Sequence, residues 1–328
     1  MAQPVNDDLS SPLKVLSMFG IEAKGTFDYE RFRTLCVRLF DADEVEQHER
    51  RTREIFELFD ANADGALNEQ ELHRCCNWIH ATVNPVNVLL VVDVQNDFID
   101  GTLALRQSGY GQEGLEVLEP INRLLRDGRW DKVMYSLDWH PENHISFFDN
   151  LAMRELHPES KITKEMAKPF DTVVFLQPHL TQTLWPKHCV MNTWGAELHK
   201  DLLILPSSER IYKGQDPDKE SYSAFENIDG SSKLDKILSA FGTTHLYVCG
   251  LALDICVKET CLDGLRFGYR VAVIDDCCRG VKPDDITAAR KIITERGGLV
   301  ECSDRILSLV NDGKRSLVMA HHAAKITS

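Results

Sequence analysis

Three side chains that could act together in covalent catalysis each follow a separate apolar run of the sequence. Cys256 lies after the run 245–249, in a stretch that predicts a strand, a turn and a helix. Backbone N–H groups at the start of a helix stabilise a thiolate, and also an oxyanion that forms beside it. Asp93 ends the run 89–92, and Lys213 ends another short apolar stretch. The set offers a nucleophile, a proton acceptor and a cation, which is an arrangement typical of enzymes.

Each member of this set also has a structural interpretation when it is taken alone. A buried carboxylate such as Asp93 can cap a neighbouring loop. A lysine such as Lys213 is more often solvated, and a cysteine such as Cys256 is more often packed as a small hydrophobic residue. The catalytic interpretation therefore depends on the three occurring together.

A second group of side chains suits a transition metal. Asp138 and His140 follow the apolar run 133–137, and His188 lies further along the chain. Two imidazoles and one carboxylate favour Zn²⁺, and Fe²⁺ or Mn²⁺ suit the same donors. Three protein ligands leave positions open for water or substrate, although an Asp-x-His pair is also common in surface loops. Alternative or additional ligands are His144, Cys189 and, through water, Glu220.

Residues 60–71 match the twelve-residue calcium loop of an EF-hand position by position. The side-chain oxygens, the glycine of the sharp turn and the closing glutamate all stand where the loop requires them, between two amphipathic helical patterns. An acidic turn without an ion is the alternative. The expected ligands are Asp60, Asn62, Asp64, the carbonyl of Ala66, Asn68 directly or through water, and Glu71.

A degenerate copy of this loop precedes it. Aligning Gly25 with Gly65 preserves the apolar and glycine positions but places Arg31 where the closing glutamate should be. EF-hands usually occur in pairs, so we expect the upstream copy to be a structural partner that binds no calcium, with chance similarity as the alternative.

Composition limits the class of protein. The chain has 328 residues, 43% of them hydrophobic, and a net charge of −14, which argues against a nucleic-acid backbone as a partner. No apolar stretch approaches the roughly 20 residues of a membrane span, and the N-terminus resembles no secretory signal. The ten cysteines follow no disulfide-scaffold spacing. We therefore expect a cytoplasmic protein that binds neither nucleic acid nor membrane. The sequence leaves open whether the protein also enters the nucleus.

The elements expected to position these groups change in character near residue 84. Residues 1–84 show helical spacing of apolar residues, residues 85–310 alternate strand and helix patterns, and residues 311–328 read as a polar, frayed tail. Alternation predicts an α/β domain with a mostly parallel sheet and helices on both faces, preceded by an all-α EF-hand domain. Strand candidates are 88–92, 133–137, 173–176, 202–205, 245–249 and 271–274, and helix candidates are 116–126, 233–241, 258–267 and 286–296.

Six motifs occur in one order: DVQNDF (93–98), DWHPENHISF (138–147), WPKHCV (185–190), NTWG (192–195), KG (213–214) with YSAF (222–225), and GLALDICV (250–257). Together they closely resemble eukaryotic nicotinamidases of the isochorismatase-like cysteine hydrolase family, over roughly residues 86 to 300. An EF-hand region before such a domain looks like the animal, insect-type members.

The resemblance implies a six-stranded parallel sheet and the hydrolysis of nicotinamide to nicotinate and ammonia within NAD salvage. By motif match, Cys256 is the nucleophile, Asp93 the proton acceptor and donor, and Lys213 the group that orients both. The resemblance also assigns an oxyanion hole to the N–H groups of Ala252 and Cys256, with a cis peptide before Ala252. It assigns metal ligation to Asp138, His140 and His188, walls of the ring pocket to Phe98 and Trp185, and a place near the metal waters to Glu220.

One position departs from some relatives, because Ile255 precedes the nucleophile where they carry an aromatic residue. Two other functions stay open at this point. One is an amidase of the same fold for another substrate, such as a carbamoyl compound, which would not need the metal triplet to bind a ring nitrogen. The other is a calcium-responsive binding protein on an inactive scaffold, which would not need the complete set of Asp93, Lys213 and Cys256.

Overall fold

The computed structural model describes residues 12–21, 25–228 and 231–327 of the chain. Its largest element is a six-stranded sheet in which every neighbouring pair of strands is parallel. This confirms the six-stranded parallel sheet expected from the sequence. In spatial order the strands are β12 (Leu299–Glu301), β11 (Arg270–Arg279), β10 (His245–Leu251), β3 (Asn87–Val92), β4 (Lys132–Asp138) and β7 (Glu209–Lys213).

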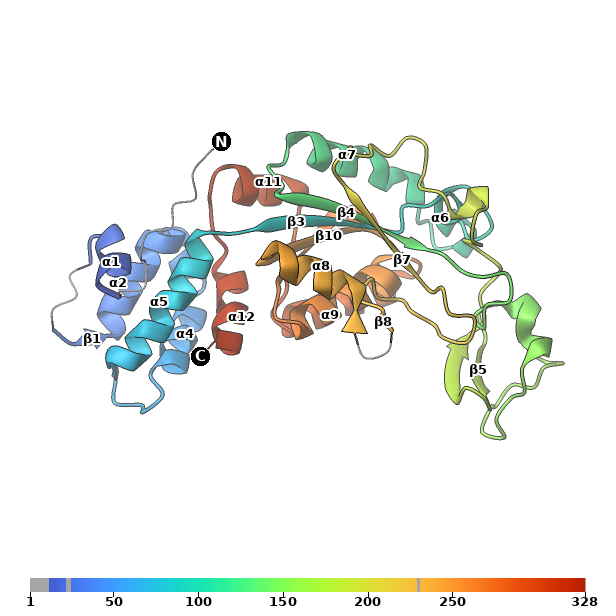
Figure 1. The fold of residues 1–328 in the computed structure, drawn as a ribbon, viewed down its shortest axis with the longest axis horizontal. Helices are drawn as coiled ribbons and strands as arrows, with labels where there is room; N and C mark the ends of the chain where they lie inside the picture. Colours follow the sequence, from blue (N-terminus) through green and yellow to red (C-terminus); the bar gives the residue numbers. More distant parts are fainter. Residues whose placement is uncertain (1–11, 22–24, 229–230, 328) are drawn as a thin grey trace.

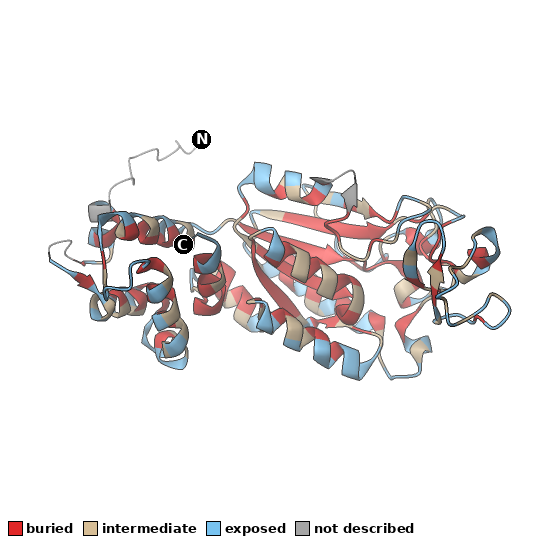
Figure 2. Cartoon of the chain, turned by 90° about the horizontal axis from the view of Figure 1, so that it is seen from below, coloured by how far each residue is buried: buried red, intermediate tan, exposed pale blue. Residues whose placement is uncertain are grey.

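Helices cover both faces of the sheet (Figure 1). On one face lie α7 (Leu118–Asp127) and α11 (Ser303–Asn311). On the other lie α8 (Lys233–Phe241) and α9 (Lys258–Arg266), and α10 (Pro283–Glu295) packs against α9. A strand covered on both faces needs apolar residues at every position rather than at alternate ones. The central strand β3 meets this requirement from Val88 to Val92, and all its residues are buried. Figure 2 shows the strands of the sheet largely in the colour of buried residues.

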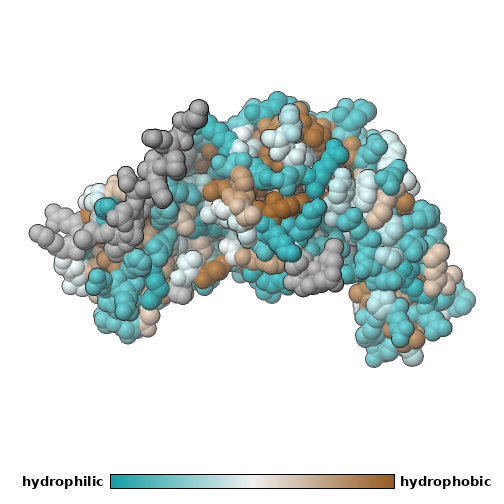
Figure 3. Space-filling model, viewed as in Figure 1, coloured by the Kyte–Doolittle hydropathy of each residue, from teal (hydrophilic) through white to brown (hydrophobic). Residues whose placement is uncertain are grey.

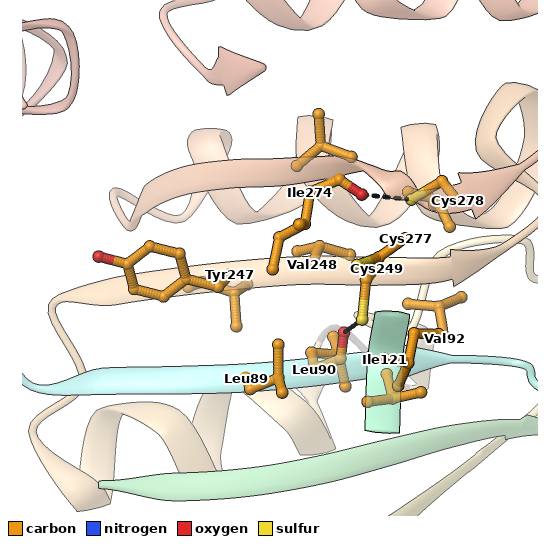
Figure 4. Packing of buried hydrophobic residues seen from close by; sticks show 14 of the residues in the cluster. Leu89, Leu90, Val92, Ile121, Tyr247, Val248, Cys249, Ile274, Cys277 and Cys278 are labelled. Atoms are coloured by element: carbon orange, nitrogen blue, oxygen red, sulfur yellow. Dashed lines mark hydrogen bonds between the residues drawn. The ribbon is translucent and has the colours of Figure 1, made fainter. Parts of the chain in front are cut away.

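Cysteines contribute to this core as small hydrophobic residues. Nine of the ten are buried, and Cys302 is exposed. Figure 4 shows Cys249 beside Leu90, with its sulfur 4.0 Å from the Leu90 carbonyl oxygen, and Cys278 bonded to the Ile274 carbonyl at 3.2 Å. Burial raises the pKa of the Cys249 and Cys278 thiols, so both stay protonated and inert at neutral pH.

The N-terminal region consists of two helix-loop-helix units. Their loops pair through two short antiparallel strands that place Phe27 opposite Leu67, the two residues that the alignment of Gly25 with Gly65 had matched. Trp78 is fully buried at the centre of this region, with the rings of Phe32, Phe40 and Phe59 around it. The elements are α1 (Pro12–Met18), β1 (Phe27–Asp28), α2 (Tyr29–Phe40), α3 (Ala42–Gln47), α4 (Glu49–Phe59), β2 (Ala66–Leu67) and α5 (Glu69–Val83).

The expected polar tail is wrong, because the end of the chain forms α12 (Leu317–Thr327). This helix lies between the N-terminal helices and the sheet (Figure 1), and Leu317, Ala320 and Ala324 belong to the same buried cluster as Trp78. The indole N–H of Trp78 donates to the carbonyl of Ala320 at 2.8 Å. The two histidines of α12 make the segment look polar in the sequence. Its alanines, however, let the helix approach its neighbours closely, and this is why it is packed rather than frayed.

Two strand predictions also need correction, and two strands were missing from the candidates. Residues 202–205 form no strand, whereas β7 and β12 do. The run at 173–176 is a strand, but it pairs in a separate antiparallel hairpin of β5 (Thr172–Phe175) and β6 (Leu180–Thr183). The remaining elements are α6 (Asn96–Ile99), the 3₁₀ turns Leu105–Ser108, Gly114–Val117, Phe148–Met153 and Trp194–Ala196, a π-helical turn at Leu253–Val257, and the pair β8 (Asn227–Ile228) and β9 (Ser231–Ser232).

The surface agrees with the strongly acidic composition. On the face shown in Figure 3, hydrophilic residues cover most of the molecule, and hydrophobic ones gather near the middle. Within the described residues, no helix combines the length and the apolar content needed to cross a membrane.

Candidate active site and metal centre

The structure brings Asp93, Lys213 and Cys256 together at one edge of the sheet. Asp93 follows β3, Lys213 ends β7, and Cys256 lies in the π-helical turn after β10, so the carboxyl ends of three parallel strands supply the group. The Nζ atom of Lys213 lies 3.0 Å from Oδ2 of Asp93 and 3.5 Å from Sγ of Cys256. The side chains of Asp93 and Lys213 are fully buried, and Cys256 is 6% exposed.

The backbone at this edge is shaped by close strand packing. Asp93 has a φ of 50°, a left-handed conformation that aspartate tolerates better than most residues. Gly250 has a φ of 119°, and a Cβ atom there would lie 2.1 Å from the carbonyl oxygen of Val92. Only glycine therefore lets β10 approach β3 at this point. That approach brings the turn with Cys256 over the end of β3.

Burial and mutual charge set the protonation of these groups. Burial lowers the pKa of Lys213, but the carboxylates of Asp138 and Asp93 raise it more, and the net pKa lies well above the usual value. Burial raises the pKa of Asp93 despite the Lys213 cation, and burial likewise raises the pKa of Cys256. The lysine is therefore a permanent cation. The carboxyl of Asp93 and the thiol of Cys256, whose ligand atoms lie within 4.8 Å of each other, are the two groups left that could exchange a proton.

The expected metal ligands also lie together. The ligand atoms of Asp138, His140 and His188 are all within 4.8 Å of one another, and all three residues are buried. Nδ1 of His140 lies 2.9 Å from the Gly214 carbonyl, and Nδ1 of His188 lies 2.8 Å from the Pro186 carbonyl. Each imidazole therefore donates through Nδ1–H and leaves the Nε2 lone pair free.

Both Nε2 atoms face the same carboxylate oxygen. They lie 3.6 and 3.9 Å from Oδ2 of Asp138, for His140 and His188 respectively. Backbone carbonyls that orient ligating histidines in this way are the usual outer shell of a protein metal site. The donor set fits a divalent transition metal with an open coordination position.

Asp138 connects the metal group to the catalytic group. Its Oδ1 atom forms an ion pair with Lys213, whereas Oδ2 faces the two imidazoles. Burial alone would raise the pKa of Asp138, but the positive charge of Lys213 lowers it below the usual range. Asp138 is thus the ionised partner of the lysine, and Asp93 is left as the carboxyl that exchanges a proton.

Two residues that hold this arrangement had no role assigned from the sequence. The side chain of Gln95 donates to the carbonyl of Asp138 and accepts from its N–H, both at 2.8 Å. The hydroxyl of Ser136 donates to Oδ1 of Asp93 at 2.7 Å. The only signal for Gln95 was its place in the motif at 93–98, and Ser136 carried none, because it is one polar residue inside an apolar strand.

The alternative ligands lie outside the group of three. His144 uses both ring nitrogens elsewhere, with Ser146 Oγ at 2.7 Å and the Lys219 carbonyl at 3.1 Å. Cys189 is buried and bonds to the Gly195 carbonyl through its sulfur. Glu220 is half-buried and accepts from Gln182 at 3.0 Å and from the Ser221 N–H at 2.9 Å.

Cys256 and the three residues Asp138, His140 and His188 line one cavity of about 900 Å³. Phe98 and Trp185, the expected walls of a ring pocket, line it together with Ala252, and Glu220 also reaches it. The Phe98 ring centroid lies 5.6 Å from that of His188, and the indole N–H of Trp185 donates to Tyr222 Oη at 3.1 Å. The expected cis peptide between Leu251 and Ala252 is present.

The predicted calcium loop lies in the N-terminal helical region. Gly65 has a φ of 87°, as its position in the sharp turn requires. The carboxylate of Glu71 accepts from the N–H groups of Ala61 and Asn68 at 3.0 and 2.9 Å, and Asp60 accepts from those of Asp64 and Gly65. The carboxylates therefore point into the loop, together with the side chains of Asn62 and Asp64, which bond to each other.

Comparison with known proteins covers the part of the chain that holds this cavity. Residues 87–305 match the model of the isochorismatase domain family. A nicotinamidase of Escherichia coli strain K12 is 38% identical over 208 residues, which cover 61% of this chain and 87% of the relative. A nicotinamidase of Saccharomyces cerevisiae is 36% identical over 210 residues, covering 61% of this chain and 90% of the relative. The structure of a yeast nicotinamidase, Pnc1p, bound to the inhibitor nicotinaldehyde superposes with a TM-score of 0.55 at 30% identity, covering 66% and 99% of the two chains.

Proposed function

The chain belongs to the isochorismatase family and is an amide hydrolase, and from that premise we propose that it hydrolyses nicotinamide to nicotinate and ammonia in NAD salvage. The observation that carries the proposal is the 3.5 Å contact of Lys213 with Cys256, which lines the same cavity as a buried Asp-His-His group. The named activity of the similar nicotinamidases and the nicotinaldehyde complex of the yeast enzyme support a small pyridine carboxamide as the substrate.

In the proposed first half-reaction, Asp93 takes the proton of Cys256 as the sulfur attacks the carboxamide carbon and forms the C–S bond. The Lys213 cation stabilises the thiolate as it develops. The N–H groups of Ala252 and Cys256 stabilise the tetrahedral oxyanion. Asp93 then gives its proton to the amide nitrogen, the C–N bond breaks, and ammonia leaves a thioester on Cys256.

The second half-reaction reverses the proton path. Asp93 takes a proton from a water molecule, whose oxygen attacks the thioester carbon. The C–S bond then breaks, and the proton held by Asp93 returns to the sulfur of Cys256. The acid loses its remaining proton to solvent and leaves as nicotinate. Phe98 and Trp185 would hold the ring between them so that the carboxamide stays over Cys256.

The metal proposal concerns the position of the ring. Asp138, His140 and His188 would hold a divalent ion, Zn²⁺ by preference and Fe²⁺ or Mn²⁺ otherwise, with Glu220 nearby to bond its waters. Such an ion supplies an open coordination position that recognises the pyridine nitrogen and orients the substrate.

The test is ammonia release from nicotinamide by the metal-loaded protein, beside Cys256→Ala. Cys261→Ala is the matched control, because Cys261 is also buried but follows in α9. We expect release by the wild type and the control and none by Cys256→Ala. No release by the wild type would favour another amide substrate or a binding protein on an inactive scaffold. Release by Cys256→Ala would contradict the cysteine mechanism.

We also propose that the loop at residues 60–71 binds Ca²⁺ and that the N-terminal region is an EF-hand pair with one functional loop. Support comes from the carboxylates of Asp60 and Glu71 that point into the loop and from the pairing of Phe27 with Leu67. The predicted ligands are Asp60, Asn62, Asp64, Ala66, Asn68 and Glu71. The region is proposed to be mainly structural, because the upstream loop lacks the ligands.

Calcium titration of the full chain tests this second proposal. Glu71 closes a capping box at the start of α5, and glutamine can fill that role. Glu71→Gln should therefore weaken calcium binding without loss of the helix cap. The exposed Glu69→Gln, in the same helical turn, is the control and should bind as the wild type does. Equal binding by all three proteins would contradict the site, and a large change of turnover with calcium would contradict a purely structural role.

A further inference from the structure

A third group of ligand-type side chains lies outside the active site, beside the β5–β6 hairpin. It consists of His157, Glu159 and His179, whose ligand atoms lie within 4.8 Å of one another. His157 is half-buried, and the other two are exposed. We propose that these three residues bind a second divalent transition metal, Zn²⁺ by the chemistry of the donors, and that this ion fastens the hairpin.

The spacing of the donors fits a tetrahedral site. Carboxylate oxygens and imidazole nitrogens bind zinc at about 2.0–2.2 Å. Two ligand atoms of a tetrahedral zinc site therefore lie roughly 3.4 Å from each other. Oε2 of Glu159 lies 3.5 Å from Nδ1 of His157 and 3.8 Å from Nε2 of His179. The two rings are 4.7 Å apart at 65°. These two separations are close to the tetrahedral spacing, so small rotations of the exposed Glu159 and His179 side chains would let the three donors share one ion.

The hydrogen bonding of His157 identifies its unprotonated nitrogen. The backbone N–H of Glu159 donates to Nδ1 of His157 at 3.2 Å, so Nδ1 carries the lone pair, and a metal bound there would replace this weak hydrogen bond. Across the described residues, the ion-pair contacts of Glu159 are with His157 and His179 and with no lysine or arginine. The carboxylate therefore lacks a permanent cation, which a bound metal would supply.

The backbone holds the two histidines together although they are far apart in sequence. The segment before Glu159 pairs with β5, through His157 N–H to the Val174 carbonyl at 2.8 Å and Leu176 N–H to the Glu155 carbonyl at 2.9 Å. His179 lies in the turn between β5 and β6. Ligands on paired strands and a tight turn lose little freedom when they bind an ion, which favours affinity.

A metal here would act on the wall of the active-site cavity. Thr172 of β5 and Thr183 of β6 line that cavity, and Gln182 of β6 donates to Glu220 at 3.0 Å. The site is separate from the Asp-His-His group, so its occupation can be measured whether or not the protein hydrolyses nicotinamide.

The first experiment counts bound zinc. The full-length protein is loaded with zinc, passed through a desalting column in metal-free buffer, and analysed for metal per chain. We expect the wild type to retain one zinc more than His179→Gln or Glu159→Gln. The control is His80→Gln, an exposed histidine on α5, which should retain as much as the wild type. Equal zinc content in the wild type and His179→Gln overturns the proposal.

The second experiment shows whether the variants lose zinc because a ligand is missing or because the hairpin no longer folds. Amide hydrogen exchange of the segment 157–179 is measured with and without zinc. Zinc should slow exchange of this segment in the wild type and in His80→Gln, and should leave it unchanged in His179→Gln. Exchange that zinc does not slow in the wild type overturns the fastening role, even if the ion binds.

Discussion

The Nζ atom of Lys213 lies 3.5 Å from the Sγ atom of Cys256, and both side chains are buried. Because the pKa of Lys213 is raised well above its usual value, the lysine cannot serve as the base. In the proposed mechanism its charge instead stabilises the thiolate, and the base is Asp93, whose pKa is raised by burial.

The variant Lys213→Met tests whether Lys213 stabilises the thiolate rather than acting as the base. Without the cation a buried thiolate loses its main stabilisation, so we expect the kcat for ammonia release to fall by at least about 100-fold. The pH profile of the rate at which iodoacetamide alkylates Cys256 should also shift to higher pH. Lys291→Met, at an exposed lysine of α10, is the control. An alkylation profile that stays in place would show that Lys213 does not set the state of the thiol.

Asp93→Asn removes the proton acceptor and keeps the shape of the side chain. The Ser136 hydroxyl can still donate to the amide oxygen, as it does to Oδ1 at 2.7 Å. General acid–base catalysis contributes about 10²–10⁴-fold, so kcat should fall by that factor while KM changes little. The acid limb of the wild-type pH–rate profile should lie above the usual pKa of an aspartate and should vanish in the variant. A variant that keeps this limb would assign it to another group.

Removal of the proposed active-site metal should act mainly on substrate binding. The proposed role of the Asp138, His140 and His188 site is to position the ring, so chelation should raise KM more than it lowers kcat, and added zinc should reverse the change. His188→Asn should behave like the chelated wild type and should not respond to zinc. If metal analysis shows that the zinc has been removed and KM is unchanged, the metal does not position the ring.

The sequence was sufficient to predict that the proposed catalytic residues converge, and insufficient for the residues that hold them. Asp93, Lys213 and Cys256 lie at or after the ends of apolar runs, and the carboxyl ends of parallel strands meet at one edge, so their convergence follows from local pattern and topology. Ser136 is different, since its hydrogen bond to Asp93 joins two strands and has no local signature. Gln95 likewise acts on a partner 43 residues away.

The end of the chain shows the same limit on a larger scale. The segment of α12 carries alanines and two histidines, and its partner Trp78 is 242 residues earlier. Only the tertiary contact explains why such a helix is buried. In contrast, the alignment of Gly25 with Gly65 already places Phe27 opposite Leu67, because the two loops share their glycine and apolar positions.

Trp78→Phe should measure how strongly α12 holds the N-terminal helices. Trp78 is fully buried, and its indole N–H bonds to Ala320 at 2.8 Å. Loss of this hydrogen bond and of part of the ring should lower the free energy of unfolding by about 1–3 kcal/mol, as urea denaturation would report. Trp194→Phe, at a tryptophan that is 58% exposed, should cost much less. Equal losses in the two variants would mean that the contact contributes little.

His321 of α12 should make this same junction sensitive to acid. Burial, with the charges of Lys325 and Arg51, lowers the pKa of His321 to about 4, against about 6.5 in the unfolded chain. Between these values the unfolded chain binds the proton and the native chain does not. The contribution of neutral His321 to stability is therefore complete above about pH 6.5 and is lost as the pH falls toward 4.

His321→Gln should remove this part of the pH dependence. The variant is expected to be less stable than the wild type at pH 7, because it loses the contact with Arg51 at 3.1 Å, and the difference should shrink at pH 5. Denaturation by urea at both pH values measures it, with His80→Gln as the control at an exposed histidine. If the wild type and His321→Gln lose the same stability between pH 7 and 5, protonation of other groups governs the acid response of the junction.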